Sequence, residues 1–173
     1  DDRAAAYQAV SYLIQQGHRK IAVLGGPATS YPSMMRRQGA QQAMEDAGIR
    51  FEDKLYGLSN YDFESAYHAM NGLLARRAEF TALFAMSDVI AFGAIRALVS
   101  AGLRVPEDVS VIGFDGITMS RYCVPVMTTI VQPSEQIALQ SIELLVRQIE
   151  HGTPAQTVTL QPELQQGESV RAI

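Results

Sequence analysis

Apolar and polar residues follow two regular patterns along this chain, one with the period of a helix and one typical of buried strands. Short, mostly apolar runs occupy residues 20–26, 54–60, 81–86, 109–114 and 127–133. Between them, apolar residues recur every three or four positions, over residues 4–16, 33–47, 62–77, 87–102 and 134–152. Runs of the first kind predict strands buried on both faces, and spacing of the second kind predicts amphipathic helices.

Strand and helix alternate regularly as far as Gly116. This alternation predicts stacked βαβ units, and therefore an α/β fold with an open parallel sheet flanked by helices on both faces. Beyond Gly116 the rhythm loosens around Pro125, and residues 156–163 and 168–173 are predicted as two final strands. A length of 173 residues suits one compact domain or slightly more.

Composition narrows the class of protein. Apolar residues make up 47% of the chain and charged residues 18%, so a core is expected and widespread disorder is not. The net charge of −4 argues against nucleic-acid binding by the chain as a whole, which requires a concentrated basic face. Cys123 is the single cysteine, so a disulfide framework is excluded and a reducing compartment fits.

The chain also lacks the segments that direct proteins to membranes. It has no apolar run of about 18 residues and no recognisable signal peptide, so we expect a cytoplasmic protein with no membrane partner. It begins at Asp1 without a methionine and enters a helical pattern at once, which suggests a fragment of something longer.

Polar residues follow each of the first four predicted strands. In an open parallel sheet, ligands sit beyond the carboxyl ends of the strands, so these residues are expected to share one rim. Tyr61 adds a flat aromatic surface among them. The four groups are Gly26-Pro27-Ala28-Thr29-Ser30, Asn60-Tyr61-Asp62, Ser87-Asp88 and Asp115-Gly116.

Asp115, at the end of the run VSVIGF, has two interpretations. An Asp-Gly pair after a strand favours an Asx-type turn, in which the carboxylate serves only its own backbone. Alternatively, the carboxylate accepts hydrogen bonds from ligand hydroxyls or a ring N–H, each contributing roughly 1.5–3 kcal/mol. The coincidence of four polar strand ends favours the second interpretation.

Six motifs in order resemble the effector-binding core of the lactose/galactose repressor (LacI/GalR) family. Each is weak alone, but together, correctly spaced over nearly the entire chain, they are specific. The resemblance implies a periplasmic-binding-protein type I-like core of two lobes that clamp a small metabolite, usually a sugar or nucleobase. It also implies a helix-turn-helix headpiece that reads operator DNA as a homodimer. The motifs are YLIQQGHRKIAVLGG, RRQGA with Arg36 and Gly39, FAMSDVIAFGAIRAL, GLRVPEDVSVIGFDG, YCVPVMTTIVQP and PELQQGESV.

The resemblance implies five ligand-binding residues. Arg36 looks like the family's ligand-gripping arginine, whose planar fork can hold two oxygens, and Asp115 like its ligand-binding aspartate. Tyr61 falls where the family places an aromatic platform. Ser87 stands where sugar-binding members often have asparagine, and Gln132 matches a polar residue at the crossing between lobes. From the residues alone, a solvated Arg36 and a Tyr61 that only packs remain alternatives.

The resemblance also divides the chain. Residues 1–131 would form the C-terminal lobe, residues 132–161 a helix and strand that return to the N-terminal lobe, and residues 162–173 a closing segment. The DNA-binding headpiece is absent, so the chain would hold about half of a cleft. Gly167 departs from the family pattern, which often has arginine there.

The helix predicted over 134–152 would then be without its neighbours. Its apolar stripe would pack in the missing lobe, so in this chain we expect it to repack or to pair with another chain. The stripe consists of Ile137, Ala138, Ile142, Leu145 and Ile149. A further apolar group, Tyr122, Val124, Pro125 and the helix around 89–98, fits either the family's dimer face or ordinary core packing.

The leading hypothesis is the effector-sensing and dimerisation domain of a transcriptional regulator. A solute-binding protein of a sugar importer shares the core and is the alternative. A sugar-modifying enzyme is disfavoured, because the sequence has no nucleophile–base pair, no G-x-G-x-x-G and no metal-ligand set. No cofactor is expected.

Overall fold

A six-stranded sheet forms the centre of the computed structural model, which describes residues 1–77 and 79–173. The strand order is β2-β1-β3-β4-β5-β6. The first five strands run parallel, and β6 pairs antiparallel with β5. The predicted α/β class is confirmed. The strands are β1 Ile21–Gly25, β2 Tyr56–Leu58, β3 Ala82–Ala85, β4 Ser110–Asp115, β5 Thr128–Val131 and β6 Glu163–Gln165.

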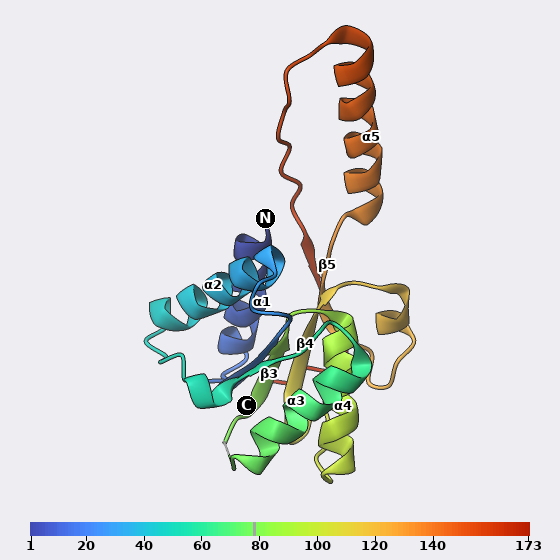
Figure 1. Ribbon diagram of the computed structural model, residues 1–173. Helices are drawn as coiled ribbons and strands as arrows, with labels where there is room; N and C mark the ends of the chain where they lie inside the picture. The colour runs from blue at the N-terminus through green and yellow to red at the C-terminus, as the bar shows by residue number, and fades with distance from the viewer. Residues whose placement is uncertain (78) are drawn as a thin grey trace.

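Helices cover both faces of the sheet. Helices α1 (Asp2–Gln15) and α2 (Tyr31–Asp46) pack together on one face, and α3 (Phe63–Ala75) and α4 (Asp88–Ser100) lie on the other (Figure 1). Two short 3-10 turns, η1 (Asp53–Leu55) and η2 (Thr118–Arg121), complete the body. The central strands β1, β3 and β4 are buried almost throughout, as their apolar runs predict.

Polar side chains cap four of the helices, including α2, where the Ser30 hydroxyl accepts from the Ser33 N–H at 3.5 Å. Asp1 accepts a hydrogen bond from the backbone N–H of Ala4 at 3.0 Å, and Asp62 one from Ser65 at 2.7 Å. The Ser87 hydroxyl accepts one from the backbone N–H of Ile90 at 3.1 Å. These N-caps satisfy backbone donors that have no partner within the helix, which favours the start of each helix directly after its cap.

Neither of the two strands predicted near the C-terminus, over residues 156–163 and 168–173, forms with the predicted bounds. Beyond β5, the described residues form a strand only at Glu163–Gln165, because that is the stretch that lies beside β5. Residues 156–162 have no neighbouring strand with which to form a ladder. Residues 168–173 bond across the sheet, with Ser169 N–H donating to Val126 and Ile173 N–H to Gln16. Alternating apolar residues make a strand only where another strand is available.

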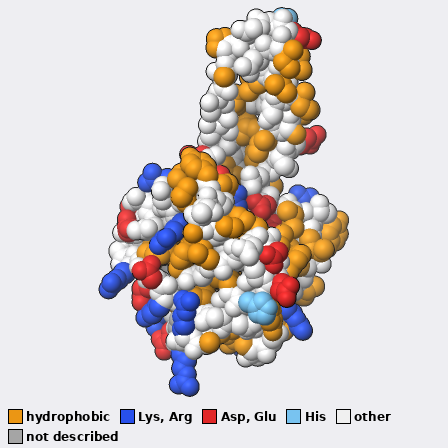
Figure 2. Space-filling view, viewed as in Figure 1, with side chains coloured by type: hydrophobic (Ala, Val, Ile, Leu, Met, Phe, Trp, Pro, Cys, Tyr) orange, Lys and Arg blue, Asp and Glu red, His pale blue; other side chains and the backbone are white. Residues whose placement is uncertain are grey.

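The helix α5 (Ser134–His151) projects from the body together with the extended residues 152–162 (Figure 1). None of its residues is buried. The expectation that its apolar stripe repacks against the body is therefore wrong, while pairing with another chain stays a prediction. Figure 2 shows hydrophobic side chains along this projecting arm, which include Ile137, Leu139, Ile142, Leu145, Val146 and Ile149.

Gly93 lets α3 and α4 approach closely. A Cβ at this position would lie 2.5 Å from the carbonyl oxygen of Phe63 and 2.7 Å from the Cβ of Ala66. We expect Gly93→Ala to force the helices apart and lower the free energy of unfolding by about 1–3 kcal/mol. Urea denaturation measures the change.

Gly72 provides the matched control, because nothing lies within 4 Å of a Cβ added there on α3. Gly72→Ala should raise the free energy of unfolding by about 0.5–1 kcal/mol through helix propensity alone. Equal effects of the two substitutions would contradict this account of the α3–α4 contact.

Candidate ligand-binding site

Three of the five predicted site residues contact one another at the carboxyl edge of the sheet. Asp115 is the last residue of β4, Arg36 extends from α2, and Gln132 follows β5. The Asp115 Oδ1 atom accepts a hydrogen bond from Gln132 Nε2 at 2.6 Å and lies 3.5 Å from Arg36 Nη1. The cluster therefore joins side chains that are up to 96 positions apart along the chain (132 minus 36).

Several partners hold the Arg36 side chain in place. Its side chain is only 7% exposed, and its Nε donates to Asp2 Oδ1 at 2.7 Å. Its Nη1 donates to the carbonyl of Met86 at 2.5 Å, and its guanidinium carbon lies 3.7 Å from the centre of the Phe114 ring. Arg36 is thus a buried, positioned cation, and the alternative of a solvated helix residue is wrong.

Burial dominates the electrostatics of Asp115. It raises the pKa of this carboxyl above its usual value, while the Arg36 cation and the hydrogen bond from Gln132 oppose the shift. Nearby Asp2 raises the pKa further. Within the described residues, the Asp115 carboxylate is bonded by the side chains of Arg36 and Gln132, and not by its own turn. This arrangement differs from the Asx-type turn that was the alternative.

Tyr61 is fixed beside the same edge. Its backbone has φ 60°, an unusual value for a residue other than glycine. The ring lies against Gly26, where any side chain would collide with it. The hydroxyl is 3.0 Å from the Ser33 hydroxyl, one turn before Arg36 on α2. The ring is therefore pinned, and its hydroxyl already has a protein partner.

Ser87 is buried at the start of α4. Its oxygen already accepts the hydrogen bond from Ile90, so its first role is structural. The five residues predicted to bind ligand all lie at the carboxyl ends of strands or on the helix beside them. That they bind a ligand stays a prediction.

Asp2 is a member of the cluster that the sequence did not predict. The polar rim was predicted only from residues that follow strands, whereas Asp2 lies at the beginning of α1. Its carboxylate reaches Arg36 because α1 crosses α2 at Gly39, where a side chain would collide with the backbone of Arg3. A glycine within the helical pattern of residues 33–47 was the one available signal of this close approach.

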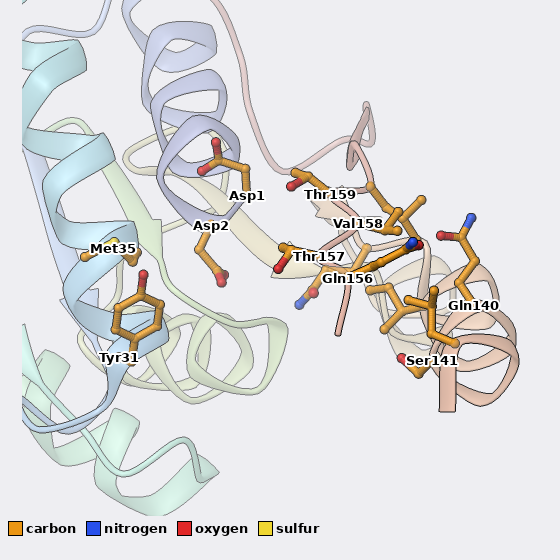
Figure 3. Close-up of a pocket in the computed structure, with 14 residues that line it drawn as sticks. Asp1, Asp2, Tyr31, Met35, Gln140, Ser141, Gln156, Thr157, Val158 and Thr159 are labelled. Carbon is orange, nitrogen blue, oxygen red and sulfur yellow. The ribbon is translucent and has the colours of Figure 1, made fainter. Parts of the chain in front are cut away.

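A hollow of about 650 Å³ lies between the body and the projecting arm (Figure 3). Asp1, Asp2 and Gln132 contribute its polar wall on the body side, next to Arg36 and Asp115. Its far wall comes from α5 and the extended segment, through Ile137, Gln140, Ser141, Leu144 and residues 156–160. The wall offers carboxylates and amides together with apolar surface, a combination that suits a small molecule carrying several hydrogen-bonding groups.

The described residues hold no group of three or more histidine, cysteine, aspartate or glutamate side chains that could bind a metal ion. No helix in the described part of the chain is long and apolar enough to cross a membrane.

Comparison with known proteins places this geometry in a family. A profile of the periplasmic binding protein-like domain matches residues 10–170. The repressor PurR of Histophilus somni is 36% identical over 171 residues, which cover 98% of this chain and 51% of the relative. PurR of Salmonella paratyphi B is 37% identical over 168 residues, covering 96% and 49% respectively. The chain thus spans about half the length of these curated relatives.

Comparison with solved structures points to the same family. A sugar-binding LacI-family regulator from Escherichia coli, in complex with phosphate, superimposes with a TM-score of 0.93 at 34% identity, over 100% of this chain and 62% of that one. A complex of the regulator CelR with cellobiose gives a TM-score of 0.94 at 35% identity, over 98% and 52%. This chain belongs to the periplasmic binding protein-like family, as an effector-binding core of the LacI/GalR type, which confirms the resemblance inferred from sequence.

Ser87 offers a test of its structural role. Ser87→Ala removes the acceptor for the Ile90 N–H, so we expect the free energy of unfolding to fall by about 1 kcal/mol. Ser87→Asn retains a good N-cap and should restore most of the loss. Thermal or urea denaturation measures both variants, and an alanine variant as stable as the parent would disprove the capping role.

Proposed function

We propose that this chain is the effector-sensing and dimerisation domain of a bacterial transcriptional regulator, a repressor that binds a small metabolite and controls operator binding. The observation that carries the proposal is the cluster of buried Arg36 with the half-buried Asp115 and Gln132, of which Gln132 lines the hollow. It supplies a cation, a carboxylate and an amide from three different elements, a combination of groups that suits recognition of a polar small molecule. The regulators among the relatives support the same conclusion.

The proposed ligand is a sugar. Its hydroxyls can donate to carboxylates and accept from a guanidinium or an amide, and the wall by Asp2, Arg36, Asp115 and Gln132 offers all of these. The Tyr61 ring would pack against the apolar face of the sugar. The complex of the relative CelR with cellobiose supports this class. Ser87 would contribute its remaining hydroxyl proton.

We infer that residues 1–131 form the C-terminal lobe, that residues 132–161 cross to an N-terminal lobe, and that residues 162–173 close the structure. The projecting arm supports this division, because β6 returns from it to pair with β5. The apolar face of α5 would then pack inside the second lobe. A DNA-binding headpiece would precede both lobes.

Ligand control would work through the angle between the lobes. A ligand held by Arg36 and Asp115 on one side and by the second lobe on the other favours the closed arrangement over the open one. Such a ligand shifts the equilibrium only by its difference in affinity for the two arrangements. The angle would set the spacing of two headpieces on operator DNA.

We propose a homodimer that uses the loop around η2. Tyr122 is 78% exposed and Val124 93% exposed, together with the exposed Met119. This exposure is at odds with core packing of Tyr122 and Val124, the alternative considered from sequence. Figure 2 shows the hydrophobic patch on the right of the body.

The protein would act in the cytoplasm, without catalysis and without a cofactor.

The proposal predicts saturable binding without turnover. Isothermal titration of the complete protein with cellobiose, free hexoses and nucleobases should identify a binding class. Asp115→Asn should then weaken the affinity by about tenfold or more, because hydrogen bonds to a charged group contribute roughly 1.5–3 kcal/mol.

Asp108→Asn is the matched control. Asp108 pairs with Arg104 at 2.9 Å on the surface and precedes β4, at the opposite end of the strand from Asp115. Its substitution should leave the affinity unchanged. Formation of a product from the probe, or equal affinities of Asp115→Asn and the parent, would contradict the proposed sensor.

Leu145 tests the division into lobes. Its side chain is 57% exposed on α5, so Leu145→Ala should change the stability of this chain by no more than about 0.5 kcal/mol. In the complete protein the same substitution should cost about 2–5 kcal/mol, because the side chain would lie in the core of the second lobe. Denaturation of both proteins compares the two values, and equal small effects would argue against the crossing of α5.

A further inference from the structure

Asp88 is a buried carboxylate without a cation beside it. It is the first residue of α4 and is 0% exposed. None of the ion pairs in the described part of the chain includes it. Two neutral donors satisfy it instead: the Thr129 hydroxyl donates to Oδ1 at 2.6 Å, and the backbone N–H of Ile117 donates to Oδ2 at 2.8 Å. A charge buried in this way is costly, so its retention calls for a reason.

The surrounding strands leave room for this carboxylate. Gly113 on β4 lies directly beside it, and a side chain there would collide with Oδ1. Thr129 comes from β5, and α4 follows directly after β3 and Ser87. Asp88 thus links the segment after β3 to residues within β4 and β5.

The turn after β4 needs such an anchor. Asp115 has φ 113° and Gly116 has φ 70°, both in the region that L side chains rarely adopt. A backbone of this kind persists only where its surroundings determine it strongly. Two hydrogen bonds bracket the turn: Gln132 N–H donates to the Asp115 carbonyl at 3.1 Å, and Ile117 N–H donates to Asp88.

We propose that Asp88 is a positioning residue, whose buried carboxylate fixes the Asp115–Ile117 turn and so directs the Asp115 side chain toward Arg36 and Gln132. The inference rests on the proposed function in one respect, the role of Asp115 in binding ligand. Asp88 itself is 0% exposed and both of its carboxylate oxygens are bonded within the protein, so it would touch no ligand.

The charge of Asp88 makes this anchor sensitive to pH. Burial, with a smaller contribution from the Asp115 carboxylate, raises the pKa of Asp88 to about 6 against the opposing hydrogen bonds from Thr129 and Ile117. The other titratable group that faces it is the Cys123 thiol, from the loop after η2. Below about pH 6 Asp88 takes up a proton and becomes a weaker acceptor, so the bond to Ile117 weakens.

Nuclear magnetic resonance of this chain, with aspartate carboxyl carbons labelled, tests the proposal without a ligand. Asp88→Asn keeps the volume of the side chain and an oxygen for Ile117, but removes the charge. The Ile117 amide resonance should follow pH with a midpoint near 6 in the parent and lose this dependence in the variant. The carboxyl carbon of Asp88 should itself titrate with the same midpoint in the parent.

Asp88→Ala removes both hydrogen bonds. Amide-hydrogen exchange at Ile117 should accelerate about tenfold or more in this variant. Asp62→Asn is the matched control, since Asp62 likewise accepts a backbone N–H at the start of α3 but lies on the surface, and it should change none of the three readouts. The asparagine variant keeps the test valid if the alanine variant does not fold.

An Ile117 resonance that still follows pH in Asp88→Asn, or amide exchange at Ile117 that is not accelerated in Asp88→Ala, would overturn the positioning role. So would changes of the same size in Asp62→Asn. All readouts come from the chain without ligand. Their failure would leave ligand binding by Asp115 untouched, whereas failure of the complete protein to bind any probe would overturn the proposed function and leave these readouts unchanged.

Discussion

The buried guanidinium of Arg36 organises the part of the body around the candidate site. Removing a charge from water costs several kcal/mol unless partners replace the solvent, and Arg36 has a partner on each side. Asp2 comes from α1, the Met86 carbonyl from the end of β3, and Asp115 and the Phe114 ring from β4. The requirement to satisfy a single side chain therefore ties α1, α2 and two strands to one another, and brings a carboxylate and a cation together behind Gln132, which lines the hollow.

The same edge of the sheet combines backbone strain with polar contact. Tyr61 and Asp115 both have positive φ, and glycines at positions 26 and 113 make room for the Tyr61 ring and for the Asp88 carboxylate. Positive φ values also occur near the opposite ends of the strands, at Gly17, Arg77 and Gly102, but there they lie in the turns that follow helices. What distinguishes the carboxyl edge is that its strained residues, Tyr61 and Asp115, carry side chains of the predicted site, as expected for a rigid scaffold that holds a prepared site.

The projecting arm, α5 with residues 152–162, is subject to a different constraint. An amphipathic helix stabilises a protein only when its apolar face is covered, and here α5 has no covering element. The body, by contrast, buries its strands on both faces with helices supplied by this chain. The molecule therefore combines a complete core with an incomplete one. This combination agrees with a chain that spans about half the length of its relatives.

The sequence by itself determined the alternation of strands and helices, the parallel sheet and the collection of polar groups at one edge. Those features follow from short-range periodicity and from the geometry of parallel strands, which bring their carboxyl ends together. Only the tertiary structure decided that Asp2 pairs with Arg36, that Ser87 is first of all a cap, that Asp88 holds the turn after β4, and that residues 156–162 form no strand. Each of these depends on a partner, present or missing, that lies far away in the sequence, and no local pattern encodes it.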